Sequence, residues 1–110
     1  MGADGFLAYY GLRWEVTDRD EISQLEKRTD PRMVAARDTG LKYWWGVTED
    51  QERHFLLIGT ELGNLGWEGD PMRTITHDEL IRIAAETQEK LRRAGFEESP
   101  ALHLQFEPDY

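Results

Sequence analysis

The sequence predicts one α+β domain in which two helical regions alternate with four strands. Three observations carry this prediction. Residues 6–16 alternate with the period of two that is typical of a strand. Residues 76–94 open with a capping box and continue with an apolar stripe at helical spacing. The chain has 110 residues, which is the length of one domain, so we expect a single unit over 1–110.

The first strand, at residues 6–16, is expected to turn one side toward the core. That side is apolar or aromatic throughout and consists of Phe6, Ala8, Tyr10, Leu12, Trp14 and Val16. The other side consists of Leu7, Tyr9, Gly11, Arg13 and Glu15. Because alternate residues of a strand point to opposite faces, we expect the second set to lie on the open face of the sheet.

Two helices are expected next. Acidic residues follow Thr17 and Asp18, and apolar residues then recur at helical spacing, so a helix is predicted over 18–28. The pair Asp30-Pro31 interrupts it, because proline disfavours helix in the residue before it and suits the first position of a new helix. The second helix is predicted over 31–39, with Gly40 as its left-handed stop.

The middle of the chain predicts a pair of strands. Residues 41–48 alternate, the polar segment 49–52 suits a hairpin loop, and the apolar run in 53–60 suggests a strand covered on both faces. Residues 61–71 contain three glycines around Trp67 and are expected to form a loop. Residues 72–75 are expected to form a short edge strand.

The last two elements complete the order. Thr76 and Glu79 predict a capping box for a helix that runs to about residue 94, and Gly95 ends it. A final strand over 99–107 follows. The order strand, helix, strand, strand, helix, strand predicts a ferredoxin-like βαββαβ fold, a four-stranded antiparallel sheet with helices on one face. Its first and third strands should lie at the centre, with the fourth beside the first.

The sheet face without helices is the predicted interaction surface. Either Phe55 and Leu57 or the residues that alternate with them must lie there, so the face is apolar in either case, and exposed apolar patches mark interaction sites. The predicted ligand- or partner-binding residues are Tyr9, Arg13, Trp44, Phe55, Trp67, His103 and Gln105. Two covers for this face are open: a second copy of the chain, or the 61–71 loop folded over the sheet.

Composition narrows the function classes. The chain carries 13 Lys and Arg against 22 Asp and Glu, a formal charge of −9, which repels phosphate backbones, so no nucleic acid is expected. It has no Cys and no apolar stretch long enough to span a membrane, and its start lacks the basic region of a signal peptide. A cytoplasmic location is therefore expected. Neither His54 nor His77 has a recognisable ligand spacing, and the glycines lack a phosphate-loop context, so no metal and no cofactor are predicted.

Three functions stay open. The first is a non-enzymatic, acidic interaction domain that forms a homodimer or binds a protein partner through its open face. The second is a small-molecule enzyme or ligand-binding protein of the dimeric α+β barrel type, with Tyr9, Arg13, Trp44 and His103 around a pocket. The third is an acidic inhibitor or immunity-type protein that fills a basic cleft. No spacing demands catalysis, so no catalytic residues are predicted and a non-enzymatic role is favoured.

Overall fold

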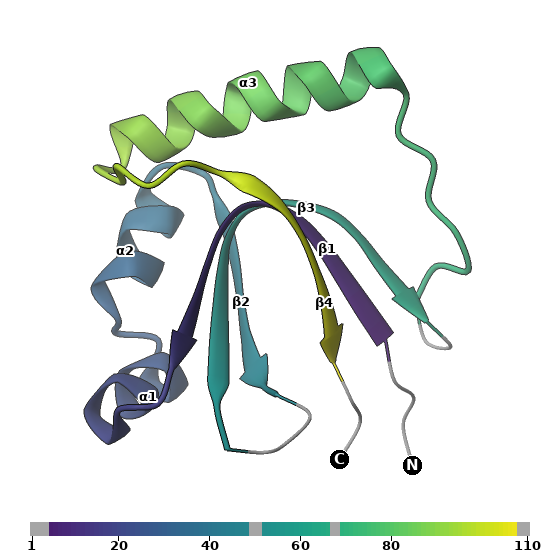
Figure 1. Ribbon diagram of the computed structural model, residues 1–110. Coiled ribbons are helices and arrows are strands. Elements are labelled where there is room, and N and C mark those ends of the chain that lie inside the picture. The colour runs from purple at the N-terminus through teal and green to yellow at the C-terminus, as the bar shows by residue number, and fades with distance from the viewer. Residues whose placement is uncertain (1–4, 49–51, 67–68, 108–110) are drawn as a thin grey trace.

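The structure is a computed structural model that describes residues 5–48, 52–66 and 69–107. Its elements are, in chain order, β1 (Gly5–Val16), α1 (Arg19–Lys27), α2 (Pro31–Asp38), β2 (Lys42–Val47), β3 (His54–Gly66), α3 (His77–Arg93) and β4 (Ala101–Glu107) (Figure 1). The strands form one antiparallel sheet in the order β2-β3-β1-β4. The α+β class is confirmed, and so is the placement of the first and third strands at the centre with the fourth beside the first.

Capping residues set the helix boundaries where the sequence predicts them. The Asp18 carboxylate accepts a hydrogen bond from the Glu21 amide at 3.2 Å, and the Asp30 carboxylate accepts one from the Arg32 amide at 2.8 Å. Gly40 and Gly95 have φ values of 78° and 92°, the left-handed conformation expected of helix stops. Aspartate side chains thus cap the N-terminal ends of α1 and α2, and left-handed glycines follow the C-terminal ends of α2 and α3.

The longest helix, α3, begins with half of the predicted capping box. The Thr76 hydroxyl accepts a hydrogen bond from the Glu79 amide at 3.2 Å, but it also donates one to the Glu79 carboxylate at 3.1 Å. Ion pairs between neighbouring turns lie along the helix. Glu89 pairs with Arg92 at 2.5 Å.

Two predictions about the segment before α3 are wrong. Residues 61–66 continue β3 as a paired strand, although their glycines suggest a loop. The partner of Ala8 is Gly63 and the partner of Tyr9 is Glu61, so Leu62 is an extra residue in a bulge, which lets the strand continue with a local change of twist. Residues 72–75 do not form a strand.

The two central strands bend at their middle (Figure 1). Gly11 of β1 is paired with Gly59 of β3 at this point. A methyl group on Gly11 would overlap the Ile58 carbonyl oxygen and would lie 2.8 Å from the Gly59 Cα; a methyl group on Gly59 would overlap the Tyr10 carbonyl oxygen. Only a pair of glycines lets the two backbones approach this closely.

The bend divides the sheet into two limbs. The first limb consists of residues 5–10 of β1, residues 60–66 of β3, and β4. The second limb consists of residues 12–16 of β1, residues 54–58 of β3, and β2. All three helices lie on the outer side of the resulting arch (Figure 1).

The outer core lies between the second limb and the helices. Its members are all 6% exposed or less and are Leu12, Val16, Leu25, Met33, Ala36, Leu41, Leu56, Ile58 and Leu91. Since α1 and α2 supply three of these side chains, the short helices cover the second limb and leave the first limb to α3 alone.

The inner core lies between the two limbs and consists of Leu7, Tyr9, Phe55 and Leu57, each 1% exposed or less. Leu7 lies near one end of the β1–β3 pair and Phe55 near the other, a separation of about 27 Å along a straight strand. The two side chains belong to one contact cluster because the sheet folds back on itself. The face that the helices leave bare is therefore covered by the other half of the same sheet.

Candidate functional site

Polar side chains close the mouth between the limbs. Arg13 of the second limb donates a hydrogen bond through Nε to Gln105 Oε1 of the first limb at 2.7 Å, and its guanidinium lies 5.8 Å from the Phe55 ring centroid. His103 Nε2 lies 3.1 Å from the Gly11 carbonyl oxygen at the bend. Three of the predicted site residues, Arg13, His103 and Gln105, therefore come together at this mouth.

Two ionisable side chains with raised pKa values, Tyr9 and Glu107, lie on the same face. Burial raises the pKa of the Tyr9 phenol, and the nearby carboxylates of Glu61 and Glu107 raise it further. Burial also raises the pKa of Glu107, while a hydrogen bond donated by the Trp44 side chain lowers it in part. Trp44 belongs to β2 and Glu107 to β4, so this bond also joins the two limbs.

The other predicted site residues fall in different places. Tyr9 and Phe55 are fully packed in the inner core, so in this structure they offer no surface to a ligand or partner. Of the two options for the third strand, Phe55 and Leu57 lie on the face without helices. Trp44 is 40% exposed at the sheet edge. Trp67 lies outside the described residues.

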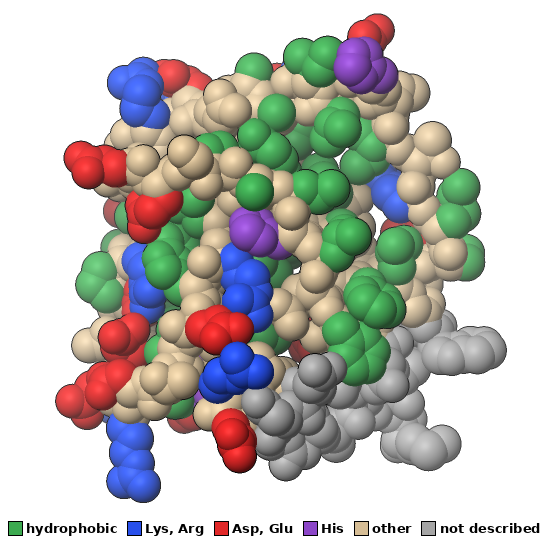
Figure 2. Space-filling model, viewed as in Figure 1, with side chains coloured by type: hydrophobic (Ala, Val, Ile, Leu, Met, Phe, Trp, Pro, Cys, Tyr) green, Lys and Arg blue, Asp and Glu red, His purple; other side chains and the backbone are tan. Residues whose placement is uncertain are grey.

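The apolar surface that the structure exposes lies elsewhere. We call it the outer patch: Phe6, Leu102 and Leu104 are 50%, 53% and 70% exposed, and half-buried Phe106 contacts Phe6 with ring centroids 5.2 Å apart. All four project from the outer side of the first limb. Figure 2 shows hydrophobic side chains gathered below the first half of α3 and down over this limb, around a hollow. Leu80 and Ile81 of α3 are also exposed.

Sequence reasoning missed the outer patch because it treated each strand side as uniformly buried or open. Phe6 shares a strand side with Leu12 and Val16, and the period of two predicts the same burial for all three. The length of the helices was the feature that could have indicated this exposure. The two helices before β2 have nine and eight residues, which is too short to cover a twelve-residue strand from end to end.

A groove of about 420 Å³ runs at the opposite edge of the sheet, along β2. Its described lining residues are Arg28, Tyr43, Trp44 and Trp45. Tyr43 and Trp45 also pack against the outer core, and Trp45 stacks on His54 with ring centroids 6.0 Å apart. Since Trp44 projects from one face of β2 and its two neighbours project from the other, the groove follows the outer edge of the strand.

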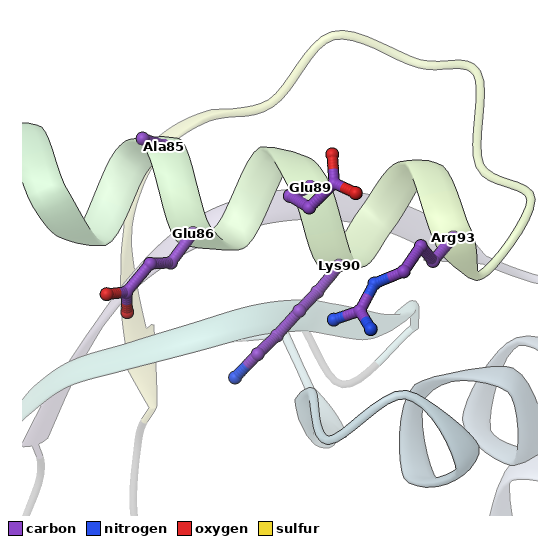
Figure 3. A pocket seen from close by; sticks show the side chains of 5 residues that line it. All are labelled: Ala85, Glu86, Glu89, Lys90 and Arg93. Carbon is purple, nitrogen blue, oxygen red and sulfur yellow. The ribbon is translucent and has the colours of Figure 1, made fainter.

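A shallower hollow of about 340 Å³ lies on α3 and is lined by Ala85, Glu86, Glu89, Lys90 and Arg93 (Figure 3). The Lys90 and Arg93 side chains extend from the same side of the helix (Figure 3). Lys90 Nζ would lie 4.0 Å from a methyl group on Gly40, which places it against the turn after α2. The described lining comes from one helix and mixes both signs of charge, so it selects no class of ligand.

Within residues 5–48, 52–66 and 69–107, no group of three or more His, Asp or Glu side chains is arranged to hold a metal ion. No helix in the described part of the chain is long and apolar enough to cross a membrane. Comparison of the chain with protein families, with curated proteins and with solved structures finds no match.

Proposed function

We propose that this protein is a small interaction domain that forms a homodimer through the outer patch and the free edge of β4. The single observation that carries the proposal is the exposure of Phe6, Leu102 and Leu104 side by side on the first limb. An apolar surface of this kind, next to a strand edge that pairs with no other described strand, favours association over solvation. The fold that we propose for the protomer is the ferredoxin-like arrangement.

The sequence of β4 supports pairing with a second copy of itself. If two β4 strands align antiparallel about Leu104, then Leu102 faces Phe106 of the second copy and His103 faces its Gln105. Apolar side chains meet on the outer face and hydrogen-bonding side chains meet on the inner face. A closed two-fold dimer satisfies both strand edges at once, so it ends growth of the sheet.

Charge makes the dimer dependent on salt. Each copy carries a formal charge of −9, so two copies repel each other at long range. The outer patch itself contains no charged side chain, and its contacts are apolar. Added salt screens the repulsion and leaves the contact intact, so we expect the dimer to strengthen as ionic strength rises.

Light scattering after size-exclusion chromatography tests the proposal with two charge-introducing variants. Leu104→Glu places two like charges opposite each other at the two-fold axis and should give a monomer. Val34→Glu is the matched control, because Val34 of α2 is 38% exposed and lies outside the outer patch, so this variant should remain a dimer. Circular dichroism should show both variants folded. A monomeric wild type at every concentration and salt level, or equal dissociation of both variants, contradicts the proposal.

A further inference from the structure

The outer edge of β2 is open on the side away from β3. β2 stands at one end of the sheet, and within the described residues its strand partner is β3 alone. Alternate residues of an edge strand direct their amide and carbonyl groups outward, where they can pair with another extended chain. The groove lined by Arg28, Tyr43, Trp44 and Trp45 follows this edge.

Arg28 reaches the groove from a strained backbone position. It has φ 60° and ψ 33°, the left-handed conformation, and it is the sole non-glycine residue with positive φ in the described part of the chain. Helices commonly end with glycine at such a position, because a Cβ atom there costs roughly 1–2 kcal/mol. The helix stop needs no side chain: the Arg28 amide bonds the Leu25 carbonyl oxygen at 3.1 Å. An arginine therefore occupies this strained position although the helix end does not require its guanidinium.

The charge of the groove is opposite to that of the chain. Arg28 is the charged residue in the described lining, in a protein with a net charge of −9. Neither a salt bridge nor a side-chain hydrogen bond holds its guanidinium within the described residues, whereas the guanidinium of Arg32 bonds Asp30. An unpaired guanidinium beside aromatic faces suits a carboxylate, which it can bind through two parallel hydrogen bonds.

We propose that the β2 edge is a peptide-binding site that takes an extended segment with a carboxylate side chain as an added strand. Main-chain hydrogen bonds to β2 hold the segment, and its carboxylate binds Arg28. Tyr43 and Trp45 give apolar contact on the same side as Arg28, and Trp44 gives it on the other side. The site is separate from the proposed dimer surface, which uses β4 at the opposite end of the sheet.

Short peptides of alternating Thr and Val test this site when they differ only in a central Glu, Gln or Lys. The host is the Leu104→Glu variant, so that pairing through β4 does not compete. Binding is followed by NMR, through the chemical-shift changes of the β2 backbone amides and of the Trp44 indole N–H. The Glu peptide should bind about tenfold more tightly than the Gln peptide, because a hydrogen bond to a charged group exceeds a neutral one, and the Lys peptide should bind most weakly.

Arg28→Gly separates the proposed role from a structural one. Glycine relieves the left-handed strain, so the variant should unfold at a higher temperature than its parent and yet lose the preference for the Glu peptide. Arg19→Ala is the matched control, because Arg19 is an exposed cation at the start of α1 that does not line the groove. That variant should keep the preference.

Three results overturn the proposal. The first is an absence of β2 shifts with all three peptides at millimolar concentration. The second is equal affinity for the Glu and Gln peptides. The third is shifts that fall on β4 instead of β2, which places peptide recognition at the edge assigned to the dimer. A wild-type monomer would remove the proposed function and leave this site intact, because the β2 experiment is carried out on a variant designed to be monomeric.

Discussion

The outer core and the inner core bury their side chains to the same extent but by different means. Leu56 and Leu57 are neighbours in β3, and both are 0% exposed. Leu56 is covered by helices, which is the usual way for an α+β protein to bury one face of a sheet. Leu57 is covered by the other limb of its own sheet. A four-stranded sheet can thus bury parts of both faces with helices on one side, provided that its central strands can bend.

The largest effect is expected from closing the space between the two glycines at the bend. We expect Gly11→Ala to destabilise the domain by at least about 3 kcal/mol, because the new methyl group collides with backbone atoms of Ile58 and Gly59 that cannot move aside independently. Urea unfolding followed by tryptophan fluorescence measures the change.

Gly63→Ala is the control for this prediction, since Gly63 also lies in β3 but a methyl group there would meet Arg73 side-chain atoms at 3.6 Å, an ordinary contact. If Gly63→Ala lowers the unfolding free energy as much as Gly11→Ala does, the bend has no special requirement for glycine.

The second prediction compares the two cores directly. Leu56→Ala and Leu57→Ala remove the same atoms from adjacent positions, so both should cost about 2–5 kcal/mol of unfolding free energy if both clusters are packed cores. Chemical denaturation of the two variants provides the comparison. A cost below about 1 kcal/mol for Leu57→Ala alone would mean that the limbs open in solution and that the inner face is available to a partner after all.

The smallest effects come from two carboxyl groups, one beside each core, that respond to pH in opposite directions. The hydrogen bond from the Arg32 side chain lowers the pKa of buried Asp30. Its stabilisation is therefore present above the unfolded-state pKa and is lost as pH falls through the folded-state pKa. Burial raises the pKa of Glu107, so its contribution is full below the ordinary carboxyl value and is lost as pH rises through the folded-state pKa.

Isosteric amides test these signs by thermal unfolding across pH. Asp30→Asn keeps a helix-capping side chain but should lower the free energy of unfolding by about 1–3 kcal/mol at neutral pH. This destabilisation should become smaller in acid. Glu107→Gln should raise the free energy of unfolding by a smaller amount at neutral pH and should leave it unchanged in acid. If Glu107→Gln instead loses stability at neutral pH, the hydrogen bond with Trp44 outweighs the cost of burying the charge.

The helix starts and the first strand were predictable because their signals are local. Caps at Asp18, Asp30 and Thr76 and the alternation in residues 6–16 act within a few residues of one another, and the structure has the expected elements there. The extension of β3 through Gly63 was not predictable in this way. Glycine marks both loops and bulged strands, and the long pairing with β1 decides between them.

The candidate site was harder to predict because burial depends on the path of the whole sheet. Periodicity assigned Tyr9 correctly to the face without helices, and it brought Arg13, His103 and Gln105 to one place. It left open which side of the third strand shares that face, and the structure places Phe55 and Leu57 there. It gave no sign that this face would fold onto itself, since the cause is a contact between Gly11 and Gly59, which lie far apart in the sequence.

The glycine pair also limits how this protein can evolve. Damage to a packed core is often repaired by a second substitution that makes a neighbouring side chain smaller or larger. At Gly11 and Gly59 the obstructing atoms belong to the main chain, so no side-chain exchange elsewhere can create room. A one-residue insertion in either strand would slide one glycine away from the other with the same result. Descendants of this domain that keep the fold should therefore retain both glycines in register, even where every residue around them has changed.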